Sequence, residues 1–161
     1  MEVTRPRSGN LLLCYFVTGK IAELRLPPVT SPARTNELWQ HTCFETFVRA
    51  PPGTGYYEFN FAPSTQWAAY RFTGYRTGMS SADEISAPRI DVRSGVGRYR
   101  LQASLELSQA VSLPSDVVWQ LALSAVIEET SGNKSYWALA HPPGKPDFHH
   151  SDCFALSLPP A

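Results

Sequence analysis

This 161-residue sequence contains little cysteine, no excess of charge of either sign and no long apolar run. Cys14, Cys43 and Cys153 are an odd number at unrelated spacings, so we expect no disulfide framework and a cytoplasmic location with reduced thiols. The 14 basic and 14 acidic residues cancel, which argues against nucleic acid or an anionic membrane as partner. No segment reaches the roughly 20 apolar residues of a membrane span, and residues 11–17 are too short for a secretory signal.

A helical period is also missing, because no segment of ten or more residues repeats its apolar positions every three to four residues. Short segments of alternating apolar and polar residues are instead separated by turns that contain Pro, Gly, Ser or Asn. We therefore expect one domain over residues 1–161, folded as an all-β, antiparallel β-sandwich. The predicted strands are 11–17, 20–26, 42–50, 55–62, 66–73, 89–94, 98–107, 118–129, 134–140 and 154–158.

The stretch from 37 to 74 is the densest in aromatic residues and in polar residues of the kind found in binding sites. Alternate residues of a strand share a face, so its three strands predict two distinct faces. The apolar face, expected to form the core, comprises Phe44, Tyr57, Phe59, Phe61, Tyr70 and Phe72. The other face comprises Glu45, Glu58, Asn60, Trp67 and Arg71.

A face that mixes aromatic rings with carboxylates, an amide and a guanidinium fits a sugar. The rings can stack on C–H faces, and the planar polar groups can bond hydroxyls. An alternative interpretation is an exposed sheet face with a buried ion pair, such as Glu45 or Glu58 with Arg71. Trp119 falls on the apolar side of its own alternating strand and is expected in the core.

Three stretches carry a family resemblance: LWQHTCFETFV, GYYEFNFAPSTQWAAYRFTGYRTGM and SYWALAHPPGKPDFHHSDCF. They resemble bacterial DOMON-like proteins, which are similar to family-nine carbohydrate-binding modules. The resemblance implies a β-sandwich of that type. It also implies that Trp39 and Glu45, which fit a W-x5-E pattern, stack on a sugar and accept its hydroxyls. Trp137 is the candidate for a second stacking tryptophan, so that the ligand would lie between Trp39 and Trp137.

Histidine and cysteine at 41 to 43 and at 149 to 153 depart from the sugar-binding modules. Imidazole and thiolate are suitable zinc ligands, so one alternative is a metal site formed by His41, Cys43, His149, His150 and Cys153. Other DOMON proteins bind haem, which makes Met79 with a histidine a second alternative. The spacing matches no standard zinc motif and there is no C-x-x-C-H segment, so no cofactor is expected in the leading interpretation.

The leading hypothesis is a non-catalytic protein that binds a small carbohydrate or sugar-like ligand, without nucleic acid or membrane as partner. Glu45 and Glu58 are also the residue types of a glycosidase pair, but sequence alone gives no distance between them. A scaffold whose aromatic face docks another protein is the third alternative, and the sequence does not indicate an oligomeric state.

Overall fold

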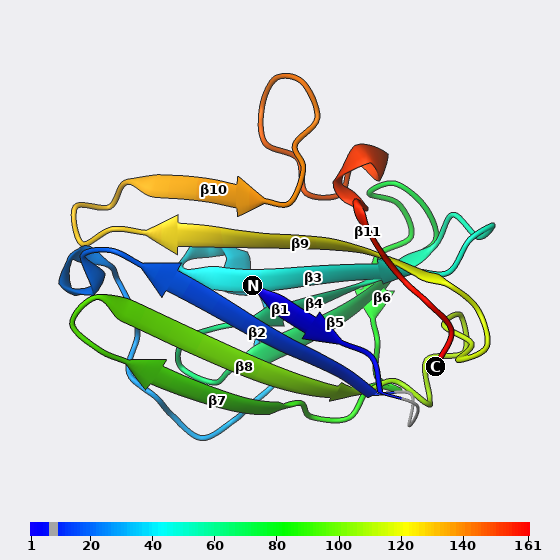
Figure 1. Cartoon of the computed structure of the whole chain (residues 1–161), viewed down its shortest axis with the longest axis horizontal. Helices are drawn as coiled ribbons and strands as arrows, with labels where there is room; N and C mark the ends of the chain where they lie inside the picture. The colour runs from blue at the N-terminus through cyan, green and yellow to red at the C-terminus, as the bar shows by residue number, and fades with distance from the viewer. Residues whose placement is uncertain (7–9) are drawn as a thin grey trace.

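The computed structural model describes residues 1–6 and 10–161 and contains two antiparallel sheets packed face to face (Figure 1). The predicted antiparallel β-sandwich is confirmed. The strands are β1 (Glu2–Thr4), β2 (Asn10–Thr18), β3 (Cys43–Arg49), β4 (Tyr56–Phe61), β5 (Trp67–Phe72), β6 (Ser80–Ser81), β7 (Arg89–Ser94), β8 (Arg98–Glu106), β9 (Trp119–Glu128), β10 (Lys134–Ala138) and β11 (Leu156–Leu158). The short 3-10 helices are η1 (Ile21–Glu23), η2 (Leu38–Gln40) and η3 (Ser151–Cys153).

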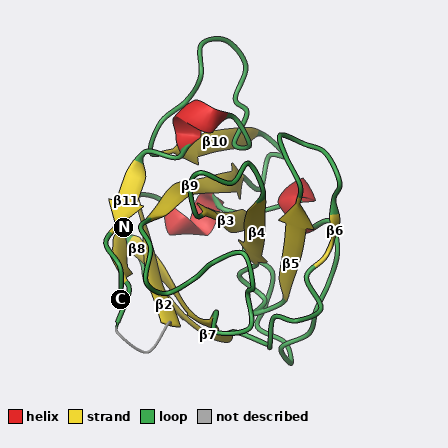
Figure 2. Ribbon diagram, turned by 90° about the vertical axis from the view of Figure 1, so that its right-hand side faces the viewer, coloured by secondary structure: helices red, strands yellow, loops and turns green. Residues whose placement is uncertain are grey.

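The two sheets differ in size. The small sheet has the order β1-β2-β8-β7, and the large sheet has the order β10-β9-β3-β4-β5-β6. Strand β9 is long enough to pair with β3 along one edge and with both β10 and β11 along the other. Figure 2 shows the large sheet curving from β10 to β6, with β2, β8 and β7 in the second layer.

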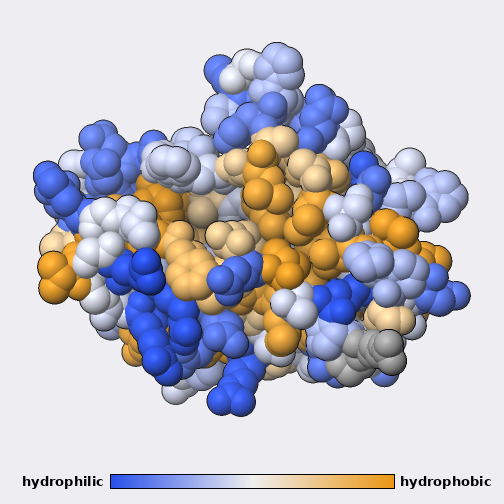
Figure 3. All heavy atoms as spheres, in the orientation of Figure 1, coloured by the Kyte–Doolittle hydropathy of each residue, from blue (hydrophilic) through white to orange (hydrophobic). Residues whose placement is uncertain are grey.

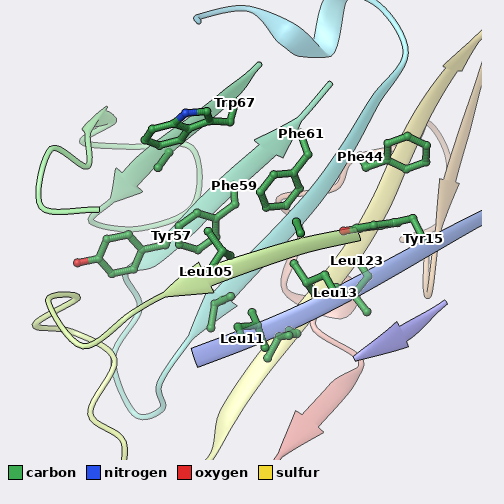
Figure 4. Close-up of a cluster of buried hydrophobic side chains, with 14 of the residues drawn as sticks. Leu11, Leu13, Tyr15, Phe44, Tyr57, Phe59, Phe61, Trp67, Leu105 and Leu123 are labelled. Atoms are coloured by element: carbon green, nitrogen blue, oxygen red, sulfur yellow. The ribbon is translucent and has the colours of Figure 1, made fainter. Parts of the chain in front are cut away.

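The main core lies between the sheets, where alternate side chains of both layers meet (Figure 4). Strand β2 contributes Leu11, Leu13 and Tyr15, and they pack against aromatic rings from β3 and β4. The Tyr15 hydroxyl lies within 2.6 Å of Thr46 Oγ1 and donates to the Glu45 carbonyl at 2.7 Å. The buried Tyr15 hydroxyl therefore has hydrogen-bond partners, and these bonds connect β2 of the small sheet to β3 of the large sheet.

The face of the large sheet that points away from the small sheet, called here the outer face, is also covered. A second apolar cluster on it joins side chains of β3, β4, β5 and β9 to the segment 148–154. Its main members are Phe47, Tyr56, Phe72, Phe148 and Phe154. The central strands of the large sheet are thus buried on both faces, and every residue of β4 is buried.

The prediction of a strand over 20–26 was wrong. Residues Ile21–Glu23 form η1, and only Leu24 makes an isolated bridge, to Glu129. A 3-10 helix brings residues i and i+3 to one side, so it directs both Ile21 and Leu24 toward the core. The alternation of Ala22, Leu24 and Leu26 with Glu23 and Arg25 had indicated a strand in this short segment.

Among the residues described, no helix is long and apolar enough to cross a membrane.

Candidate functional site

Strands β3 and β4 place two carboxylates on the outer face. The register pairs Glu45 with Asn60 and with Ser124, and it pairs Glu58 with Tyr70. Glu45 and Glu58 are therefore diagonal neighbours on one sheet face, separated by a single cross-strand step. Their shared outward orientation is the one that the alternation in these two strands predicted.

A cavity of about 420 Å³ opens above these carboxylates and is called here the outer pocket. The sheet supplies its floor, η2 supplies one wall, and the loops around residues 76 and 148 supply the rest. Its lining consists of Trp39, Glu45, Glu58, Phe72, Arg76, Met79, Val126, Tyr136, Pro146, Phe148 and His149.

The two carboxyl groups at the floor are almost inaccessible to water, with 3% of Glu45 and 5% of Glu58 exposed. Burial, followed by the nearby charge of Glu58, raises the pKa of Glu45 to about 8. Burial likewise raises the pKa of Glu58 to about 7, although the hydrogen bond from Asn60 favours its charged form. These are the most strongly shifted carboxyl groups of the described chain, and both line the same cavity.

Each carboxyl group is only partly satisfied by the protein. Ser124 Oγ donates to Glu45 Oε2 at 3.3 Å, and Asn60 Nδ2 donates to Glu58 Oε1 at 2.8 Å. Asn60 is fully buried, and its Oδ1 has no hydrogen-bond partner among the described residues. Asn60 does not line the pocket, whereas Glu45 and Glu58 do, so the acceptor capacity that a ligand can use is that of the two carboxyl groups.

His149 stands beside Glu58 with its ring fixed by Tyr56. The backbone N–H of Arg76 donates to the Tyr56 hydroxyl at 3.2 Å, so the hydroxyl proton is directed to His149 Nδ1, 2.8 Å away. This favours the tautomer with a proton on Nε2, which lies 3.7 Å from Glu58 Oε2. Burial, and then the charge of Arg76, lowers the pKa of His149 to about 4, so the ring is neutral at pH 7.

A clasp between two loops holds this wall in place. Asp147 accepts from the Tyr75 hydroxyl and from the Arg76 guanidinium, whose Nη2 lies 2.7 Å from Asp147 Oδ1. Asp147 also accepts from the backbone N–H of His149 at 3.2 Å. Burial alone would raise the pKa of Asp147, but the hydrogen bonds from Tyr75 and Arg76 outweigh it and leave the pKa below its ordinary value.

Two half-exposed aromatic rings line the outer pocket. Trp39, in η2, packs edge-on against Tyr70 with ring centroids 5.9 Å apart, and 37% of the residue stays exposed. Tyr136, on β10, packs against Phe148 with centroids 6.2 Å apart and is 47% exposed. Because these flat rings are only partly buried by the protein, an exposed part of each ring can stack on a ligand.

The prediction that Trp67 and Arg71 share the face of Glu58 was wrong. The register pairs Phe61 with Trp67 and Tyr57 with Arg71, so both residues point to the inner side of the sheet. Trp67 is buried in the main core, and the half-exposed Arg71 pairs with Glu84 at 3.3 Å. The outward residues of β5 are those assigned to the core by the sequence pattern: Ala68, Tyr70 and Phe72.

Trp137 also points away from the outer pocket. It pairs with Ala125, an inner-face residue, and lines a different cavity of about 450 Å³ at the open edge of the sandwich. Hydrophobic side chains gather there between β10–β9 above and β2 below (Figure 3), and 64% of Trp137 is exposed. A ligand cannot lie between Trp39 and Trp137, because the two indoles are on opposite faces of the large sheet.

Of the seven residues predicted to bind ligand, the structure thus brings Trp39, Glu45 and Glu58 to one pocket, with Asn60 behind them. Sequence reasoning missed Arg76, Met79, Tyr136, Phe148 and His149 as members of the same pocket. Tyr136 was one position away from the chosen tryptophan. Adjacent residues of a strand point to opposite faces, so only one of the two can face the outer pocket. Which one does so depends on the register between β9 and β10, and the sequence of β10 alone does not give that register.

The histidines and cysteines proposed as a metal site occupy separate environments. His41 Nδ1 lies 2.7 Å from Glu128 Oε2, Cys43 is buried in β3, and His150 caps η3 by accepting from the Asp152 N–H. Burial raises the pKa of the Cys43 thiol well above its ordinary value, which disfavours the thiolate. Within the part of the chain described, no three His, Cys, Asp or Glu residues are grouped to hold a metal ion. Met79 lines the outer pocket, and the buried Cys153 places its Sγ 3.2 Å from the Asp147 carbonyl oxygen.

Comparison with known proteins supports the fold. The chain superposes on a candidate carbohydrate-binding protein from Bacteroides uniformis ATCC 8492 with a TM-score of 0.65 at 13% sequence identity, covering 91% of this chain and 71% of that one. It also matches a family-nine carbohydrate-binding module from Caldicellulosiruptor kristjanssonii in complex with glucose, with a TM-score of 0.42 and 12% identity over 80% of this chain and 59% of that one. No family model and no curated protein matches the sequence.

Proposed function

We propose that this chain is a non-catalytic carbohydrate-binding β-sandwich whose ligand occupies the outer pocket. The observation that carries the proposal is the arrangement of two buried carboxyl groups below two half-exposed aromatic side chains, Trp39 and Tyr136. Sugars need this combination, because their C–H faces stack on rings and their hydroxyls bond to planar acceptors. The volume of about 420 Å³ lies within the range of small-molecule sites and suits a mono- or disaccharide.

The outer pocket offers a sugar both hydrogen-bond acceptors and a hydrogen-bond donor. Glu45 and Glu58 have oxygens left for sugar hydroxyls, and His149 Nε2–H is a donor beside them. The 3.7 Å between His149 Nε2 and Glu58 Oε2 is too long for a direct hydrogen bond, and a hydroxyl between them could bond to both. The Bacteroides neighbour, named as a candidate carbohydrate-binding protein, is consistent with this function. The proposed relationship to DOMON-like proteins rests on the sequence motifs.

The positions of the carboxyl groups favour binding over hydrolysis. A glycosidase places its two carboxyl groups on either side of the scissile bond. Glu45 and Glu58 project from adjacent strands of the same sheet face, so both would meet a ligand from below. We therefore propose that they hold hydroxyls and do not cleave a glycosidic bond.

The proposal is tested by titrating the chain with a panel of mono- and disaccharides, followed by tryptophan fluorescence and isothermal titration calorimetry. We expect at least one sugar to bind and to change the emission of Trp39. Trp39→Ala should reduce affinity at least tenfold. Trp137→Ala is the matched control, since it removes an exposed indole outside the pocket and should leave affinity unchanged.

Absence of binding across the panel would refute the proposal. An equal loss of affinity in both tryptophan variants would also contradict it, because only one indole lines the outer pocket. Circular dichroism of each variant shows whether the fold is retained.

A further inference from the structure

The two carboxyl groups that face the outer pocket, those of Glu45 and Glu58, have no cationic partner from a Lys or Arg side chain of the described residues. The cation that lines the pocket, Arg76, is held by Asp147 with two nitrogen–oxygen contacts of 2.7 and 3.2 Å. His149, which also lines the pocket, is partly buried, and its Nδ1 lies 2.8 Å from the Tyr56 hydroxyl, as expected of a neutral ring.

The unused oxygens of the carboxyl groups face the cavity. Glu45 Oε1 has no hydrogen-bond donor among the described residues, and Glu58 Oε2 has only the distant His149 Nε2 at 3.7 Å. Both side chains are more than nine-tenths buried and both line the cavity, so water outside the pocket cannot solvate them fully. A buried carboxylate without a cation or a full set of donors is unfavourable, and a ligand that supplies both removes the cost.

We propose that the outer pocket selects a sugar that carries a free, protonated amino group over the corresponding neutral sugar. This inference rests on the proposed carbohydrate-binding function and narrows its ligand class. An ammonium group offers three donors and one positive charge to the two carboxylates.

Binding of an ammonium requires the carboxyl groups to be ionised, so it should release protons near neutral pH. The titratable groups around them are Tyr56 on β4, Tyr70 on β5, Cys43 on β3, and His149, Asp147 and Arg76 in the covering loops. Burial raises the pKa of Tyr56, Tyr70 and Cys43, and the pair Arg76–Asp147 stays charged, so none of these groups exchanges a proton at pH 7. The released proton would come from Glu45 or Glu58.

The experiment is calorimetry on the full chain at pH 7.0 with D-glucosamine, D-glucose, N-acetyl-D-glucosamine and cyclohexylamine. We expect glucosamine to bind at least tenfold more tightly than glucose and N-acetylglucosamine. The binding enthalpy should vary with the ionisation enthalpy of the buffer, as proton release requires. Glu58→Gln and Glu45→Gln should each reduce glucosamine affinity more than glucose affinity, while Glu106→Gln, an exposed carboxylate on the other sheet, should change neither.

Equal affinity for the amino sugar and the neutral sugars would overturn this inference and leave the carbohydrate proposal intact. Binding of cyclohexylamine as tight as that of glucosamine, with no binding of glucose, would support a cation site and overturn the carbohydrate proposal. No binding by any of the four compounds would overturn both. If one glutamine variant does not fold, the other still tests the role of the carboxyl pair.

Discussion

Replacement of one buried carboxyl group should change how the stability of the protein depends on pH. Glu45→Gln keeps the size of the side chain and an oxygen that can accept from Ser124 Oγ. It removes a group whose pKa is raised from 4.5 to about 8, mainly by burial. The folded state therefore binds this proton more tightly than the unfolded state does.

The sign and size follow from proton linkage. An acid with a raised pKa makes the free energy of unfolding fall as pH rises, by about 1.4 kcal/mol per pH unit between its unfolded and folded pKa values. For Glu45 this amounts to roughly 4 kcal/mol between pH 5 and 8. Glu58 adds a fall up to about pH 7, while His149, whose pKa is lowered from 6.5 to about 4, opposes it below pH 6.5. Below pH 6.5 these two slopes cancel, so Glu45 determines the net trend.

The assay is urea denaturation at half-unit pH steps from 5 to 8, with tryptophan emission as the signal. At pH 5 the wild type and Glu45→Gln should agree within about 1 kcal/mol, because a neutral acid and an amide are then compared. At pH 8 the variant should be the more stable protein. Glu106→Gln is the control and should follow the wild type, since its carboxylate is exposed. Parallel wild-type and Glu45→Gln curves over the whole range would refute the assignment of a raised pKa to Glu45.

Three further predictions test the two faces of the large sheet. Phe59→Ala should lower the free energy of unfolding by about 3–5 kcal/mol, measured by chemical denaturation, because its ring is fully buried in the main core. Tyr56→Phe should weaken sugar binding in calorimetry, since it removes the donor to His149 Nδ1 and releases the ring; unchanged affinity would contradict this. Trp67→Ala should lower the melting temperature more than Trp39→Ala does, and a reversed order would contradict the inner placement of Trp67.

The fold and part of the candidate site were predictable because strands β3 and β4 carry an unambiguous pattern. In β4, three aromatic residues at alternate positions leave Glu58 and Asn60 on the opposite face, whatever the surrounding topology. In β3, the same alternation places Glu45 beside them. Local sequence determines which residues share a face, and here two adjacent strands gave the same answer.

Strand β5 shows where this reasoning fails. Ala68, Tyr70 and Phe72 are at least as apolar as Trp67, Ala69 and Arg71, so hydrophobicity selects the wrong inner face. The register of the hairpin with β4 decides the matter by pairing Phe61 with Trp67. A shift of one residue reverses every side chain of a strand, and no signal within β5 reports it.

The wrong assignment of faces in β5 and the pocket residues that sequence reasoning missed have the same cause. A sheet that is buried on one face gives an alternating pattern, whereas this sheet is buried on both faces, and in β5 both faces carry apolar side chains. Its second cover is the irregular segment around 147–154, which is held by the contacts of Asp147 with Tyr75 and Arg76. Irregular segments carry no periodicity, so their docking position cannot be read from spacing. This segment places Phe148 and His149 beside the carboxyl groups in the outer pocket. It also covers the outer face of β5, and the apolar residues on that face are the ones that the sequence pattern assigned to the core. One irregular segment therefore explains the wrong prediction in β5 and completes the proposed binding site.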